Sequence, residues 1–405
     1  MKNLFKSVKS TFIVTLLGLY LVSAGASWLF FSYTKGGSSL STSELNSARS
    51  KISELPKTEE CPINGQMFST VEREIWEGRR PMGIMIENHL DSRPQSGLSR
   101  ADVVYEAVAE GGITRFLGLF YCGAAAENVA VGPIRSARVY FIDWISEYGE
   151  EPLYVHFGGA NNICTNKEDP ACLANGTKRK GVVDKRVMAI EKLIDMGWRH
   201  SKGNALDGGA NAGAPAIVRD QYRLSETPSA WEHSAVGSTD LLFDLGIERG
   251  FGGNWDKGFE QWTFSEDQPV INSAAKSIKF EFWPNSADYN VEWKYDERTN
   301  SYQRDNGGKA HTDWEYDKPQ LTAKNVVVMF VPEEGPVDEE KHIYYETMGA
   351  GDMILFQNGD VVKGTWEKSS QYARTKFYNE DGQEISFVRG TIWLEAVPEG
   401  NTIDY

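Results

Sequence analysis

Three arginines lie in otherwise apolar stretches of the first half of the chain. Arg115 follows Glu110-Gly-Gly-Ile-Thr, and Arg135 and Arg138 belong to Val131-Gly-Pro-Ile-Arg-Ser-Ala-Arg138. A guanidinium group presents a rigid fork of N–H donors that matches a carboxylate or a phosphate, and it needs such a partner where apolar neighbours exclude water. The three arginines therefore predict a place where negative charge is bound.

Two glutamates near Arg115 indicate a second kind of chemistry. If Gly111 and Gly112 form a two-residue turn, the flanking strands pair as a hairpin. Side-chain alternation then places Glu106, Glu110 and Arg115 on one face. Two carboxylates near one cation titrate apart, so one of them is expected to stay protonated and serve as a catalytic general acid. A structural network of salt bridges is the alternative interpretation.

Arg135 and Arg138 are expected at the start of a helix. Pro133 breaks the preceding strand, Ser136 is a suitable N-cap, and the apolar spacing over 140–148 is helical. A helix N-terminus carries partial positive charge, so cations there favour a nearby anion. That anion is either a carboxylate of the chain or a phosphate or carboxylate of a ligand.

Other polar residues give weaker signals. Glu87 alternates with His89 and Asp91, but a metal site needs a third good ligand nearby, so solvated loop residues and no metal are expected. Glu87 remains a ligand-binding candidate together with His156, at the end of a predicted strand. The glycine-rich segment 207–213 lacks the spacing of nucleotide-binding loops, and no cofactor is expected.

Composition limits the classes of partner. The chain has 405 residues and a formal net charge of −15, and 40% of its residues are hydrophobic, as in a globular protein. Broad binding to nucleic acid needs a basic surface, so nucleic acid is not an expected partner. A local basic site within this acidic surface is compatible with the total charge.

Four cysteines fit an oxidising compartment. They allow three pairings. Cys164 and Cys172 close a short loop and are expected to pair, which leaves Cys61 to pair with Cys122. A zinc site would need closer spacing.

The first 35 residues predict the location of the protein. Lysines at positions 2, 6 and 9 precede an uncharged run over 10–34, which is long enough to cross a bilayer as one helix. Positive charge before the run orients the N-terminus toward the cytoplasm. We expect a single-pass signal anchor in the cell membrane over 1–35, with the bulk of the chain extracytoplasmic. A signal peptide cleaved after Ala26 is the alternative.

The remaining sequence predicts two domains of different fold class. Residues 36–79 read as a polar stalk and lead-in. Strand and helix patterns mix over 80–245, which predicts an α+β or α/β N-terminal domain, and 246–259 form a joint. Alternating apolar and polar residues, with Asn-Gly and Asp-Gly turns, predict a mostly antiparallel β C-terminal domain over 260–405.

Several different short motifs follow one another in a specific order between residues 80 and 397. Besides the two arginine segments, they are Arg80-Pro-Met-Gly-Ile-Met-Ile-Glu-Asn-His89, Arg93-Pro-Gln-Ser-Gly97, Ala101-Asp-Val-Val-Tyr-Glu106, Tyr295-Asp296, His311-Thr-Asp313, Asn325-Val326 and Gly364-Thr-Trp366. Together they resemble the bacterial YerB-like lipoprotein family. The resemblance implies an envelope-associated protein of two domains and unknown chemistry. No lipobox cysteine follows the hydrophobic segment, so a transmembrane helix is expected in place of a lipid anchor.

Two functions are compatible with these residues. The first is binding of an anionic cell-envelope component, a glycan or a lipid-linked precursor, through Arg115, Arg135 and Arg138. The second is cleavage of a glycan, by a hydrolase or a lytic transglycosylase, with Glu110 or Glu106 as the acid. The excess of arginines and the lack of a separate nucleophile favour binding.

Overall fold

The computed structural model describes residues 51, 52, 54–164, 172, 173, 178, 182–270 and 272–405. The membrane segment predicted over 1–35, and the stalk as far as residue 50, lie outside these residues. Within the described part of the chain, none of the helices has the length and apolar character needed to span a membrane. Contacts group residues 55–405 as one compact unit, and all that follows concerns this unit.

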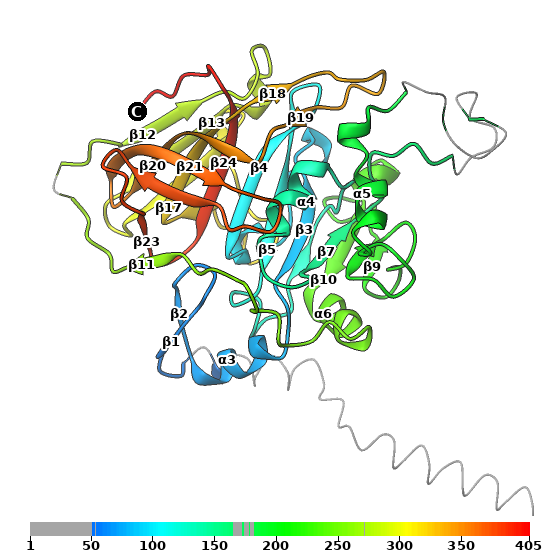
Figure 1. Cartoon of the computed structure of the whole chain (residues 1–405). Helices are drawn as coiled ribbons and strands as arrows, with labels where there is room; N and C mark the ends of the chain where they lie inside the picture. Colours follow the sequence, from blue (N-terminus) through cyan, green and yellow to red (C-terminus); the bar gives the residue numbers. More distant parts are fainter. Residues whose placement is uncertain (1–50, 53, 165–171, 174–177, 179–181, 271) are drawn as a thin grey trace, which may run out of the picture. The chain divides into compact units, whose positions relative to one another are not determined.

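A ten-stranded mixed sheet forms the centre of this unit (Figure 1). Its order is β22-β21-β20-β17-β24-β4-β5-β3-β7-β8, with strands β3 (Met82–Glu87), β4 (Val103–Glu110), β5 (Ile113–Phe120), β7 (Leu153–His156), β8 (Ala205–Asp207), β17 (Asn325–Val331), β20 (Gly349–Gln357), β21 (Asp360–Lys368), β22 (Lys376–Asn379) and β24 (Ile392–Pro398). Strand β24 pairs in parallel with β4. Strands from the two halves of the sequence thus share one sheet.

The central strands are buried on both faces, which explains their nearly continuous apolar sequences. Gly111 and Gly112 connect β4 to β5 with φ values of 59° and 79°, a left-handed geometry that glycine adopts without strain. The hairpin predicted from the glycine pair is therefore confirmed.

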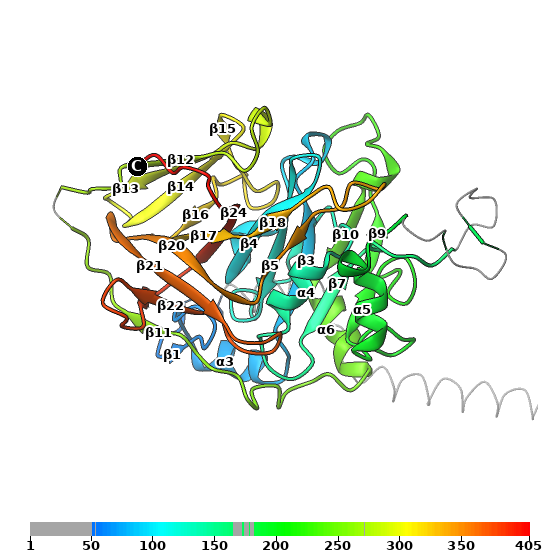
Figure 2. The same cartoon turned by 45° about the horizontal axis from the view of Figure 1, so that its top comes forward.

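Helices accompany the N-terminal part of the sheet (Figure 2): α3 (Thr70–Glu77), α4 (Val139–Ile145), α5 (Ala189–Asp195) and α6 (Thr239–Glu248). Helix α4 approaches β3 closely because Gly83 has no side chain. A Cβ atom there would lie 2.7 Å from Cδ1 of Ile145. Gly246 lets α6 approach Leu153 of β7 in the same way. The mixed α and β character predicted for this half is confirmed.

The C-terminal half is almost entirely β. Its second sheet contains β12 (Ser277–Phe280), β13 (Val291–Asp296), β14 (Ser301–Asn306), β15 (Lys309–Ala310) and β16 (Thr322–Ala323).

Smaller sheets occur in both halves of the chain. They pair β1 (Glu59–Glu60) with β2 (Met67–Phe68), β11 (Thr263–Ser265) with β23 (Ser386–Val388), and β18 (Glu333–Glu334) with β19 (Tyr344–Tyr345). A three-stranded sheet has the order β6 (Ala130–Val131), β10 (Ala235–Ser238), β9 (Ile217–Arg219).

Both predicted disulfides are present. Cys61 is bonded to Cys122, and Cys164 is bonded to Cys172. The first bond joins the segment that precedes α3 to the end of β5. The second closes a local loop between α4 and α5.

The two disulfides should differ in their contribution to stability, because loop-closure entropy grows with the length of chain that is cross-linked. For separations of 61 and 8 residues, this entropy corresponds to about 4 and about 2.5 kcal/mol. Replacing Cys61 and Cys122 together by serine should therefore lower the melting temperature more than replacing Cys164 and Cys172. Calorimetry of the two double variants measures the difference; an equal or reversed order would contradict the prediction.

Candidate functional site at the ends of parallel strands

Three neighbouring parallel strands, β3, β7 and β8, end at the same edge of the large sheet. Their last residues are Glu87, His156 and Asp207. The residues over 134–137 cross this edge, because the Arg135 amide donates to the Met85 carbonyl at 2.9 Å and the Ala137 amide donates to the Gly158 carbonyl at 3.0 Å. The carboxyl edge of parallel strands is a frequent ligand site in α/β sheets.

This edge brings together most of the residues predicted from the sequence. We call Glu87, Glu110, Arg115, Arg135, Arg138 and His156 the strand-end cluster. Arg115 lies on β5 opposite Glu87 of β3. His156 is fully buried, and its Nδ1 lies 2.8 Å from the Gly158 carbonyl oxygen.

The prediction of Ser136 as the N-cap is wrong. The chain is still extended at Arg138, and α4 begins at Val139 without a side-chain cap bond. The reason is that residues 134–137 form bridges to neighbouring strands, Ile134 to Ile86 and Ala137 to Gly159. Arg138 is nevertheless the N-cap residue of α4, so its expected place at the start of the helix is confirmed, whereas the Arg135 amide is bonded to β3 at the sheet edge.

Carboxylates of the chain itself contact all three arginines. Nη2 of Arg115 lies 2.9 Å from Oε2 of Glu110, and Arg138 forms an ion pair with the other oxygen of the same glutamate. Nε of Arg135 lies 2.9 Å from Oε1 of Glu87. The second oxygen of Glu87 lies 2.8 Å from Nδ1 of His233.

The cluster keeps an excess of positive charge, with three guanidinium groups against two carboxylates. Burial lowers the pKa of Arg115, of Arg135 and of Arg138, which means that the charged forms are held at a cost in desolvation. Asp338 and Glu340 add negative charge near Arg138, although Glu340 also pairs with Lys178 and Asp338 contacts His342. Nε of Arg138 and Nε2 of His156 are buried without a hydrogen-bond partner among the described residues.

Glu106 does not belong to this cluster, contrary to the prediction. A bulge between Val108 and Glu110 shifts the hairpin register by one residue, so Arg115 lies opposite Ala107 and Glu106 lies opposite Phe116. One extra residue on a strand reverses which face the later side chains occupy. Glu110 therefore contacts Arg115 on one face of the sheet, while Glu106 points to the other.

On that second face, Glu106 forms a fully buried network with Arg304 of β14 and Glu395 of β24. All three side chains are 0% exposed. Arg304 Nη2 contacts Glu106 directly, and its Nε lies 3.7 Å from Glu395 Oε1. The arrangement of one arginine between two carboxylates, predicted around Arg115, thus occurs around Arg304. Burial and the neighbouring Glu106 raise the pKa of Glu395 well above its ordinary value.

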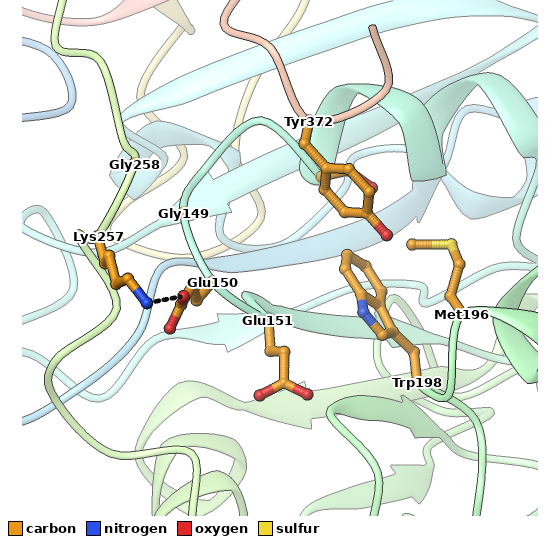
Figure 3. Close-up of a pocket in the computed structure, with 9 residues that line it drawn as sticks. Gly149, Glu150, Glu151, Met196, Trp198, Lys257, Gly258 and Tyr372 are labelled. Carbon is orange, nitrogen blue, oxygen red and sulfur yellow. Dashed lines mark ion pairs between the residues drawn. The ribbon is translucent and has the colours of Figure 1, made fainter.

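Two cavities open on the surface of the unit, and one of them borders the buried network. One of about 330 Å³ is lined by Arg93, Lys309 and His311, and His311 Nδ1 lies 2.6 Å from Arg304. It reaches the edge of the buried network. The other, of about 540 Å³, lies away from both clusters and is drawn in Figure 3. Glu150 and Glu151 line it with a single cation, Lys257, so it does not favour an anion.

The match to known families follows the same two halves of the sequence. Residues 69–202 match the N-terminal domain, and residues 278–394 the C-terminal domain, of the family described as protein of unknown function (DUF3048). The chain belongs to this family. The resemblance to YerB-like proteins seen in the motifs is thereby confirmed.

A relative and a solved structure agree with this assignment. The chain is 27% identical over 350 residues to the "Putative lipoprotein YerB" of Bacillus subtilis, a match that covers 86% of this chain and 89% of that protein. The crystal structure of the YerB protein from Bacillus subtilis superposes with a TM-score of 0.63 at 23% identity, over 86% of this chain and 100% of that chain. The family fold is therefore shared along nearly the whole body.

Sequence reasoning missed several residues of these sites. Asp207 ends β8, and the position of a carboxylate directly before two glycines was a usable signal for a strand end. His233 was not among the predicted site residues, although its side chain contacts Glu87. Arg304 and Glu395 gave no signal, because their partner Glu106 lies about two hundred residues or more away in sequence.

The raised pKa of Glu395 predicts a pH-dependent loss of stability. The unfolded side chain titrates near its ordinary value of 4.5, whereas the folded protein keeps the proton to a much higher pH. Above the unfolded pKa the folded state therefore binds more protons, and the free energy of unfolding falls as pH rises, by up to about 1.4 kcal/mol per unit. Replacing Glu395 by Gln should flatten this decline in denaturant titrations from about pH 5 to about pH 8.

The control for this prediction is the double variant Glu106→Gln, Glu395→Gln. It leaves Arg304 buried without a carboxylate, which should cost about 3–5 kcal/mol. If the single variant Glu395→Gln keeps the pH slope of the wild type, the assignment of a neutral Glu395 is wrong.

Proposed function

We propose that the chain is a membrane-anchored envelope protein that binds an anionic envelope component, a phosphate- or carboxylate-bearing glycan or lipid-linked precursor, at the strand-end cluster. The observation that carries the proposal is the charge of this cluster. Three desolvated arginines share two carboxylates, so an additional anion would complete their neutralisation.

The position of the cluster supports the same function. It lies at the carboxyl edge of β3, β7 and β8, a position at which α/β sheets frequently bind ligands. Arg135 is the most accessible of the three arginines, with 26% of its side chain exposed. A ligand would meet Arg135 first and then the partly exposed Glu110 with its two arginines.

The envelope location is supported by two further observations. Two disulfides fit an extracytoplasmic compartment. The relative from Bacillus subtilis is named as a lipoprotein, and lipoproteins are held at a membrane. The uncharged N-terminal run supplies an anchor for this chain in place of lipid.

Cleavage of a glycan fits the geometry less well. Glu106 is fully buried and contacts Arg304, so a substrate does not reach it. Glu110 has both carboxylate oxygens in ion pairs, with Arg115 and Arg138. A general acid needs a proton and access to the leaving group, and neither glutamate combines the two.

Arg135→Ala should weaken binding to anionic cell-wall material by about 1.5–3 kcal/mol, the size of a charge-assisted hydrogen bond. The full chain, purified in mild detergent, would be sedimented with bacterial sacculi before and after acid removal of their phosphate-bearing polymers. Binding should fall with added salt, because exposed charges are screened. Arg138→Ala should also weaken binding, but it should lower stability as well because it leaves Glu110 with one partner.

Arg298→Ala is the matched control. Arg298 is 82% exposed on the turn between β13 and β14 and pairs with Asp296, so the variant changes net charge equally, at a position outside the cluster. If Arg135→Ala and Arg298→Ala bind sacculi equally well, the cluster is structural and the proposed function is wrong.

A further inference from the structure

We propose that His89, Asp91 and His233 form a binding site for a divalent transition-metal ion of the zinc class. The proposal does not rest on anion binding at the arginines, because the observations that carry it concern the two histidines and Asp91. On the sequence alone, His89 and Asp91 lacked a third ligand. The fold supplies one, because His233, at the end of a short 3-10 helix (Trp231–His233), lies against the turn that follows β3.

The three side chains converge on one small region. One potential ligand atom from each residue lies within 4.8 Å of those from the other two. The imidazole rings of His89 and His233 are stacked, with centroids 4.6 Å apart and an angle of 12° between their planes. Two imidazoles and one carboxylate are the ligand set of many open zinc sites, in which water or a ligand takes the fourth position.

The contact of His233 with Glu87 is the strongest observation in favour of a metal site. Its Nδ1 lies 2.8 Å from the Glu87 carboxylate, which holds the ring in the tautomer with the proton on Nδ1. The lone pair is then on Nε2, the nitrogen left for a metal ion. A metal-bound histidine almost always donates its other N–H to a carboxylate or carbonyl in this way. Glu87 is itself fixed by Arg135.

The ligand set suits a transition metal. Asp91 supplies one carboxylate, and the two imidazoles bind metal in their neutral form and add no charge. A nitrogen-rich ligand set of this kind suits zinc better than calcium or magnesium.

Binding requires a modest closure of the two exposed ligands. Tetrahedral coordination at about 2.0–2.1 Å places ligand atoms roughly 3.3 Å apart, which is less than their present spread. His233 is buried and fixed, whereas 33% of the His89 side chain and 72% of the Asp91 side chain are exposed. His89 and Asp91 can therefore turn toward His233 without disturbing the core. In doing so, His89 gives up a weak bond from the Asp91 amide to its Nδ1, at 3.2 Å.

The test uses the full chain in mild detergent, purified without a histidine tag and stripped with chelator. Zn²⁺ titrated by calorimetry should bind with one ion per chain, and Co²⁺ should give the visible absorption band of a site with four or five ligands. Zn²⁺ should also raise the melting temperature. His89→Ala and His233→Ala should each weaken the affinity by at least about tenfold, and Glu87→Gln by about 10–100-fold.

His200→Ala is a closely matched control. Nδ1 of His200 accepts a bond from the Lys202 amide at 3.2 Å, the same local turn as at His89, but the second residue is a lysine. This variant should bind Zn²⁺ like the wild type. If the wild type shows no Zn²⁺-dependent rise in melting temperature, or if His89→Ala binds as tightly as the wild type, the site does not exist. Because His89 is partly exposed, His89→Ala is expected to fold. It therefore tests the metal site even if His233→Ala does not fold.

Discussion

The packing of the N-terminal half of the chain against the C-terminal half depends on the buried guanidinium group of Arg304. In the parallel register of β24 and β4, Glu395 lies directly opposite Glu106. Two carboxylates opposite each other repel, and both are fully buried here. Arg304 forms an ion pair with Glu106, while burial and the charge of Glu106 raise the pKa of Glu395 and so favour its neutral form. Trp393, Trp293 and Phe116 pack around the guanidinium group and keep it in an apolar environment.

The bulge in β4 determines which face of the sheet carries Glu110 and therefore the candidate site. Glu106 and Glu110 are four residues apart, and a regular strand would direct both to the same side. The bulge before Glu110 separates them, so the hairpin contributes one glutamate to the internal network and the other to the arginines. Any shift of β4 that restored regular pairing would place Glu110 in the core and leave Arg115 and Arg138 without their shared carboxylate.

Local patterns were sufficient to predict the hairpin turn at Gly111 and Gly112, the strands that flank it and both disulfide pairings, because each depends on residues close in sequence or on simple elimination. The bulge was not predictable, since Ala107, Val108 and Ala109 are all apolar and do not indicate which residue is the extra one. The pairing of β24 with β4 was also hidden, because strands nearly three hundred residues apart leave no trace in either local sequence. Hence the arginines and the contact of Arg115 with Glu110 were predicted correctly, whereas Glu106 was assigned to the wrong arginine.

Glu87 connects the two proposed sites through its two carboxylate oxygens. One contacts Arg135, and the other contacts His233. An anion on Arg135 would compete for the guanidinium group and leave more of the Glu87 charge for the imidazole. A more strongly polarised imidazole is a better metal ligand. By linkage, a metal on His233 must then favour the anion by the same factor. Occupancy of the two sites is therefore expected to be positively coupled through a single buried carboxylate.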